Sequence, residues 1–151
     1  MTNPAVSSGV FPCYTNQFQV ANGPASQAPS FVNIADMETY SVAFENGIKE
    51  WHSYGEEGWI KRLMTAKGVK ISVKGKRCVG DAGNDVIAGM AMENGTKAQK
   101  TIKWTFPDGD AVVFENAVIN VTALNADDAI KVGPLEFEIL SNGKPTYTPA
   151  A

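Results

Sequence analysis

The sequence is poor in the residues that catalysis and metal binding require. Among its 151 residues there is one histidine, His52, and there are two cysteines, Cys13 and Cys78. His52 lies beside Trp51 in an alternating segment, which is typical of a surface strand residue rather than of a general base. No Gly-x-Ser-x-Gly, Cys-x-x-Cys or His-x-x-x-His motif is present. The sequence therefore predicts no catalytic residue, no metal site and no cofactor, and a protein that is not an enzyme.

Long apolar runs and a secretory leader are also missing. No run approaches the roughly 20 apolar residues of a membrane span, and Met1–Pro4 begins neither a basic nor an apolar leader segment. We therefore expect Cys13 and Cys78 to be free thiols in a reducing cytoplasm. The net charge of −3 and the pI of about 5.1 are opposite to the balance of a protein that binds nucleic acid on its own.

Glycine and proline, in contrast, are plentiful. Fourteen glycines and eight prolines indicate many turns, as an all-β domain needs. Residues 1–30 differ from the rest because they include four prolines and no charged residue. We interpret residues 1–30 as an extended N-terminal arm, either a disordered leader or a segment that orders against neighbouring subunits. Residues 31–151 are interpreted as one β domain.

Strand signals are dense after the arm. Thr39–Glu45 alternates and leads into Asn46-Gly47, the strongest short signal for a hairpin turn. We therefore predict a return strand at Ile48–Tyr54, with Trp51 facing the core, and then a long loop or short helical turn at Gly55–Gly68. Further alternating strands are predicted at Val69–Lys74, Thr101–Phe106 (with Trp104 inward), Ala111–Leu124 and Leu135–Ile139.

One short helix interrupts these strands. The segment from Gly80 to Asp85 superficially resembles a calcium or phosphate loop, but it lacks the ligand spacing of the first and the Lys-Ser/Thr ending of the second. We interpret it as a turn before a helix at Asp85–Glu93, with Asn84 as N-cap and Asn94-Gly95 as the stop. With about six to seven strands and one flanking helix, the sequence predicts a mainly β fold, a β-sandwich or barrel.

Charge is unevenly distributed along the chain. Seven basic residues and no acidic one lie between positions 61 and 77: Lys61, Arg62, Lys67, Lys70, Lys74, Lys76 and Arg77. This block could form a nucleic-acid groove, although only Trp59 is nearby for base stacking. It could instead protect an edge strand with lysines, or meet an acidic face of another copy of the chain. The third explanation fits a protein whose partner is itself.

An ordered set of short motifs resembles the tail tube proteins of bacteriophages that infect Gram-positive bacteria. The resemblance covers about residues 37–148, and each motif is weak alone. The motifs are Phe44–Gly47, Glu57–Thr65, Gly75–Arg77 with Gly80–Asp85, Phe106–Gly109, Ala117–Thr122, Leu135–Leu140 and Asn142–Tyr147.

The resemblance implies a structural subunit of the virion tail with a tail-tube β-sandwich fold. Hexameric rings would join their inner sheets into one barrel and stack into a tube, through which DNA passes into the host without specific binding. Partners would be the protein itself and the tape measure, tail terminator and distal tail proteins, with no membrane, and assembly would take place in the host bacterial cytoplasm.

The resemblance also suggests contact residues. A long loop, here about Tyr54–Gly68, would reach an adjacent ring, so the candidates for inter-subunit and inter-ring contacts are Trp59 and the seven basic residues. An acidic lumen would let DNA slide, and Glu136 and Glu138, which alternate with Leu135, Phe137 and Ile139, are the lumen-facing candidates.

Other functions remain open at this point. The same fold would serve as the inner tube of a contractile tail, a tailocin or a related injection system. A virion-associated β-sandwich binding module, for carbohydrate or a capsid surface, would need an exposed aromatic platform. Trp51 and Trp104 are predicted to face the core and only Trp59 to be exposed. A hydrolase has the least support, because no nucleophile–base set exists.

Overall fold

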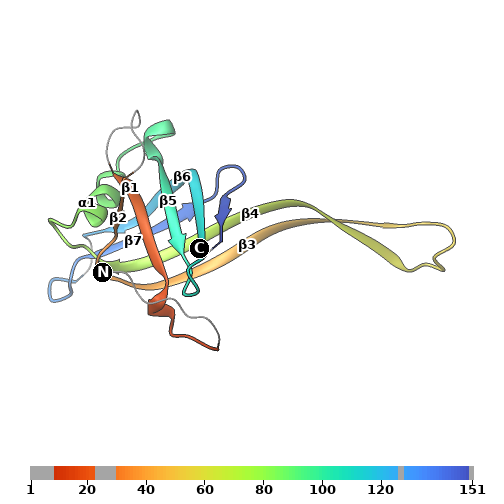
Figure 1. Cartoon of the computed structure of the whole chain (residues 1–151). Coiled ribbons are helices and arrows are strands. Elements are labelled where there is room, and N and C mark those ends of the chain that lie inside the picture. The colour runs from red at the N-terminus through yellow and green to blue at the C-terminus, as the bar shows by residue number, and fades with distance from the viewer. Residues whose placement is uncertain (1–8, 23–29, 126–127, 150–151) are drawn as a thin grey trace.

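The computed structural model describes residues 9–22, 30–125 and 128–149, and shows a β body from which one long hairpin projects (Figure 1). Its elements, in chain order, are η1 (Cys13–Thr15), β1 (Gln17–Asn22), β2 (Ser30–Asn33), β3 (Met37–His52), β4 (Ile60–Lys76), α1 (Ala82–Gly89), η2 (Gly95–Ala98), β5 (Gln99–Thr105), β6 (Ala111–Leu124), β7 (Pro134–Leu140) and β8 (Thr146–Thr148).

The strands form one antiparallel sheet in the order β2-β1-β5-β6-β7-β4-β3, and β8 pairs with the start of β6. The sheet encloses a single core, because alternate residues of β1, β4, β5, β6 and β7 point inward and pack together with α1. Leu135, Phe137 and Ile139 are buried as predicted, opposite Ile71 and Val73 of β4. The mainly β sandwich with one short flanking helix is confirmed, with eight strands in the described residues instead of six or seven.

Helix α1 begins three residues earlier than predicted. Its N-cap is Asp81, whose carboxylate accepts from the backbone N–H of Asn84 at 3.0 Å. Asn84, which we predicted as the N-cap, is inside the helix and fully buried. Gly83 permits this position because a Cβ there would lie 2.1 Å from the backbone oxygen of Asn33. Asp81 and Asn84 are both residue types that favour the N-cap position. The prediction chose Asn84, whereas the N-cap is Asp81.

The predicted hairpin turn at Asn46-Gly47 is wrong. Strand β3 continues through it, with a register irregularity between Gly47 and Ile48. Gly47 serves close cross-strand packing instead, since a Cβ there would lie 2.8 Å from the Cβ of Ala66. The chain reverses between His52 and Ile60, where Gly55 and Gly58 have positive φ.

Two further expectations fail with that turn. The predicted loop at Gly55–Gly68 is strand from Ile60 onward. Trp51, predicted to face the core, is 43% exposed because its strand has already left the body.

The sheet includes part of the segment that we interpreted as an N-terminal arm. Strand β1 lies between β2 and β5, and its Val20 is completely buried. Phe18 stacks on Trp104 of β5 with ring centroids 5.6 Å apart, which places the predicted inward Trp104 against the core. Residues 1–8 and 23–29 of the arm lie outside the described residues.

Candidate functional site

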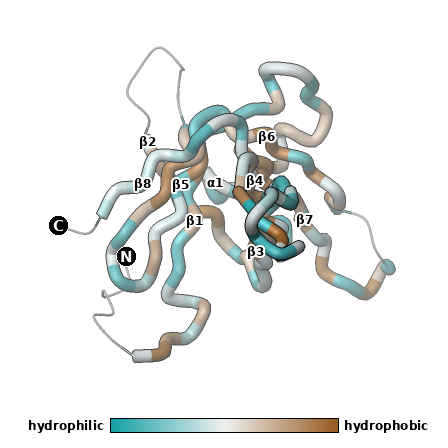
Figure 2. The backbone as a smooth tube through the Cα atoms, turned by 90° about the vertical axis from the view of Figure 1, so that its right-hand side faces the viewer, coloured by the Kyte–Doolittle hydropathy of each residue, from teal (hydrophilic) through white to brown (hydrophobic). Residues whose placement is uncertain are grey.

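The projecting part of the β3–β4 hairpin, residues 44–69, is hereafter called the ribbon (Figure 1), and in Figure 2 it points toward the viewer. Strand β7 pairs with β4 only from Lys70 to Lys76, so no third strand among the described residues supports the ribbon. Its exposed large apolar side chains are Phe44, Ile48, Trp51, Tyr54, Trp59, Leu63 and Met64. A two-stranded hairpin is marginally stable in water, and a large exposed apolar surface marks an interaction site.

Sequence reasoning found only Trp59 of these apolar residues. A signal for others exists in an adjacent apolar pair within the strand, Leu63-Met64. Because neighbouring strand residues point to opposite faces, such a pair places one apolar side chain on each face. In a strand with one buried face, apolar and polar residues would alternate instead.

The predicted basic contact residues divide into two groups and a separate Arg77, and most form ion pairs within the chain. On the ribbon, Lys61 pairs with Glu56 at 3.3 Å and Arg62 with Glu50 at 3.2 Å, and all four side chains are about half exposed. Lys67 Nζ lies 3.5 Å from Asn46 Oδ1. Such exposed pairs are worth little, so the ribbon cations can exchange partners on assembly.

The second group lies on the body. Lys70 pairs with Glu138 at 3.0 Å and Lys74 with Glu136 at 3.7 Å, across the β4–β7 ladder. These two glutamates are the predicted lumen residues, and both point away from the core. Lys70 and then Asn120, which donates to Glu138 at 3.0 Å, hold the pKa of Glu138 below its ordinary value. Lys76 pairs with Glu38 at 3.1 Å.

Arg77 belongs to a polar network at the N-terminus of α1. Its guanidinium donates to Asn84 Oδ1 and Asp85 Oδ1, both at 2.8 Å, and this keeps the pKa of Asp85 below its ordinary value. The Asn84 amide donates to the carbonyls of Ala35 and Lys76, and its oxygen also accepts from a backbone N–H. Arg77 therefore has a role in fastening the helix to the sheet, and its guanidinium is occupied within the chain.

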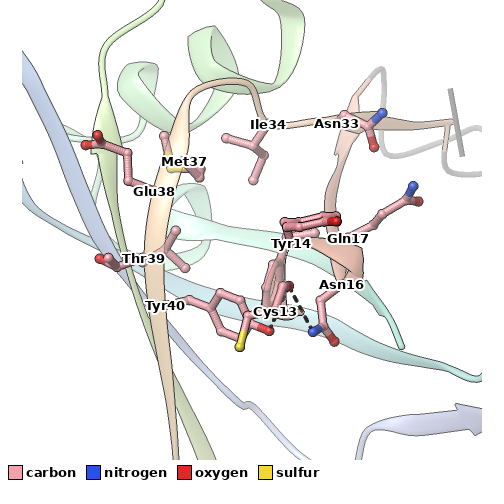
Figure 3. A pocket seen from close by; sticks show the side chains of 12 residues that line it. Cys13, Tyr14, Asn16, Gln17, Asn33, Ile34, Met37, Glu38, Thr39 and Tyr40 are labelled. Carbon is pink, nitrogen blue, oxygen red and sulfur yellow. Dashed lines mark hydrogen bonds between the residues drawn. The ribbon is translucent and has the colours of Figure 1, made fainter. Parts of the chain in front are cut away.

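A pocket of about 480 Å³ lies between the N-terminal segment and the start of β3 (Figure 3). Tyr40 donates to the backbone oxygen of Cys13 at 3.4 Å, and its ring meets Phe18 edge-on. Burial of Tyr40, followed by the nearby Cys13, raises the pKa of its hydroxyl. The residues that line the pocket include no histidine and no basic side chain, and Glu38 is the one carboxylate among them. The pocket joins segments far apart in the chain, which no local signal predicts.

The described residues contain no group of three or more His, Cys, Asp or Glu side chains placed to hold a metal ion. Across the same part of the chain, no helix is both long and apolar enough to span a membrane. Cys13 and Cys78 are free thiols.

Comparison with known proteins gives similarity in structure alone. No family model matches the sequence, and no curated protein matches it. The fold is similar to a chain in the tail of an empty GTA particle refined with helical C6 symmetry (TM-score 0.70, 14% identity, 93% of this chain and 100% of that one). A chain in the virion of the native gene transfer agent (GTA) particle is also similar (TM-score 0.66, 18% identity, 93% and 100%).

A third similar chain comes from the sheath–tube complex of PVC, an extracellular contractile injection system, in its extended state (TM-score 0.58, 13% identity, 95% of each chain). At these identities the likeness shows the fold. It spans nearly the whole chain, and the three structures are a GTA tail, a GTA virion and a sheath–tube complex.

Proposed function

We propose that the chain is a structural, non-enzymatic subunit of a phage-tail-like tube. Its rings would be hexameric, as the C6 symmetry of the similar GTA tail suggests, and would stack around a channel through which DNA passes into the host. The observation that carries this proposal is the ribbon, which exposes seven large apolar side chains on an unsupported hairpin. A surface of this kind is stable when another subunit covers it.

The proposed contacts follow from the positions of the predicted residues. Trp59, Lys61, Arg62 and Lys67 lie on the ribbon, where they would meet the adjacent ring. The pairs formed by Lys70, Lys74 and Lys76 lie on the body. If Glu136 and Glu138 line the lumen, DNA passes a surface of paired charges rather than an acidic wall.

The proposed setting is the virion tail, assembled in the host bacterial cytoplasm. Partners beyond the protein itself would be the tape measure, tail terminator and distal tail proteins. The comparisons concern gene transfer agents and an injection system, so a phage of Gram-positive bacteria stays a prediction from the sequence.

Negative-stain electron microscopy of the purified full-length protein at high concentration tests the proposal. We expect rings with six-fold symmetry, as in the similar GTA tail, and tubes built from them. A matched variant replaces residues 47–66 with Asn-Gly between the paired Asn46 and Lys67. It should fold, as judged by circular dichroism, and remain a monomer. A wild-type protein that sediments only as a monomer at every concentration would overturn the proposal.

The inner tube of a contractile tail or injection system is the second candidate. The similarity to a chain of the PVC sheath–tube complex favours it. Purified tubes that recruit a sheath protein encoded beside this gene would support this candidate, and the absence of such a gene would oppose it.

A binding module is the third candidate, and the exposure of Trp51, Tyr54 and Trp59 favours it. A monomer that binds glycans through these side chains, and never assembles, would support it over a tube.

A further inference from the structure

The register of the ribbon assigns each side chain to one of two faces. Directly paired residues share a face, and the pairs alternate along the hairpin. Glu50 and Arg62 are paired and joined by a 3.2 Å contact, which confirms the register near the tip. Gly47 and Ala66 are paired, and the 2.8 Å approach between their Cβ positions confirms it near the bulge.

One face of the ribbon continues the core face of the body. The pairs Tyr40–Val73 and Val42–Ile71 belong to the core or pack against it, and Val69 also packs against it. Beyond Phe44–Val69, the pairs on the same face alternate between polar and apolar side chains. We call this the inner face of the ribbon; its apolar residues are Phe44, Ile48, Ile60, Met64 and Val69.

The opposite face, here called the outer face, is also partly apolar. Trp51 pairs with Lys61 and Leu63 pairs with Lys49 on this side. Trp51 is 43% exposed and Leu63 is 59% exposed. Leu63 and Met64 are neighbours in the sequence and point to opposite faces, so each face has a large apolar side chain at the same height of the ribbon.

A hairpin that lies on a single surface needs only one apolar face, and its other face is polar. Apolar side chains on both faces fit a strand pair that is covered on both sides. Resting on the proposed tube function, we propose that the ribbon inserts between two other copies of this chain, with its inner face against one copy and its outer face against the other.

Two observations point to copies of this chain as the occupants. The inner face lies on the same side of the sheet as the core face, and the polar pairs Asn46–Lys67 and Glu50–Arg62 separate its apolar residues. The body of another copy would cover a face that begins beside the packing of Ile71 and Val73. The ribbon holds four basic and four acidic residues, and the net charge of −3 therefore lies on the rest of the chain. On the outer face, Lys49 and Lys61 flank the apolar residues and match such an acidic partner.

Substitutions on one face at a time test the inference in the full-length protein. The inner-face variant is Ile48→Ser with Met64→Ser, and the outer-face variant is Trp51→Ser with Leu63→Ser. Each should raise the critical concentration for tube assembly by about tenfold or more. Val79→Ser with Met92→Ser is the control, because these apolar residues are exposed on the body, and it should assemble like the wild type.

A photo-crosslinking amino acid at position 63 or position 64 provides a readout of sidedness that does not depend on stability. We expect the two positions to label different segments of the partner chain. Identical labelled segments, or normal assembly of either double variant, would overturn two-sided insertion and leave the tube itself standing. Failure of the wild-type protein to assemble would instead overturn the proposed function.

Discussion

Strand β4 passes through two environments within one continuous run of hydrogen bonds. From Lys70 to Lys76 it lies between β3 and β7, and its inward residues Ile71 and Val73 are buried. From Ile60 to Gly68 its one neighbour among the described strands is β3, and its side chains are exposed or partly exposed. Pairing with β3 extends through both halves, so the difference lies in the second neighbour, β7, and in what covers the side chains.

The length of this strand follows from its pairing with β3. Its body half also has buried side chains, which the ribbon half lacks. In the body, the free energy of unfolding draws on apolar area removed from water. In the ribbon the apolar area is still exposed to water. The ribbon therefore has low local stability until another surface covers it. Paired substitutions, one in the body and one in the ribbon, test this difference.

Two phenylalanines give the largest expected contrast. Phe137 of β7 is 1% exposed and Phe44 of β3 is 64% exposed. Phe137→Ala should lower the free energy of unfolding of the unassembled chain by about 3–5 kcal/mol, because it leaves a cavity in the core. Phe44→Ala should lower it by less than about 1 kcal/mol. Urea denaturation below the assembly concentration measures both, and equal losses would contradict the division into two environments.

Two asparagines give the next contrast. Asn84→Ala leaves the carbonyls of Ala35 and Lys76 and the backbone N–H of Cys78 without the partner that satisfies them. We expect a loss of about 2–3 kcal/mol in the free energy of unfolding. Asn46→Ala on the ribbon removes one 3.5 Å contact and should change stability by less than about 0.5 kcal/mol. Thermal unfolding followed by circular dichroism measures the loss of stability in both variants. Equally small losses would show that the network around Asn84 is dispensable.

Two glycines of β4 sharpen the comparison within a single strand. A Cβ at Gly75 would lie 2.3 Å from the backbone oxygen of Asp36, whereas one at Gly68 would make ordinary contacts at 3.5 Å. Gly75→Ala should therefore cost about 1–3 kcal/mol through overpacking. Gly68→Ala should be neutral or stabilise the chain by up to about 1 kcal/mol, through the unfolded state. Denaturation midpoints of the two variants are the measurement, and a destabilised Gly68→Ala variant would contradict the open packing of the ribbon.

The smallest expected effect depends on pH. Arg77 lowers the pKa of Asp85 in the folded chain from its ordinary value of 3.8, so the unfolded chain binds the proton more tightly. The stability that this pair contributes is complete above that ordinary value and is lost as the pH falls through the lower folded value. Asp85→Asn should therefore destabilise the protein at pH 7 and weaken the dependence of its urea midpoint on pH between 5 and 3.

Glu50→Gln is the matched control on the ribbon. It breaks an exposed pair with Arg62, which salt and solvent screen. We expect its urea midpoint to follow that of the wild type at each pH. A loss at pH 7 equal to that of Asp85→Asn would show that the two ion pairs are equivalent.

The sequence predicted the body well because its strands are half buried. Ile71 and Val73, and Leu135 with Phe137 and Ile139, alternate with polar residues, and alternation identifies such strands. The predicted strands Thr101–Phe106 and Ala111–Leu124 are also confirmed, and a turn joins them in which the Phe106 N–H donates to the Asp110 oxygen at 2.7 Å.

The ribbon could not be predicted in the same way. Asn46-Gly47 carries the local turn signal, but cross-strand packing of Gly47 on Ala66 uses the glycine for another purpose. Apolar residues on both faces of the ribbon obscure the alternation that would have identified a strand. The network around Asn84 also escaped prediction, because it joins Ala35 to a helix 49 residues away in the sequence.

The charge pairs across β4 and β7 have a consequence at longer range. Lys70 lies 3.0 Å from Glu138 and Lys74 lies 3.7 Å from Glu136, so each pair acts as a short dipole. The potentials of its two charges nearly cancel at a few times that separation, about the same distance as that over which salt screens charges, roughly 8–10 Å. In the proposed tube, a polyanion moving along this face would meet a shallow potential that alternates in sign, with neither a deep trap nor a strong barrier to its passage.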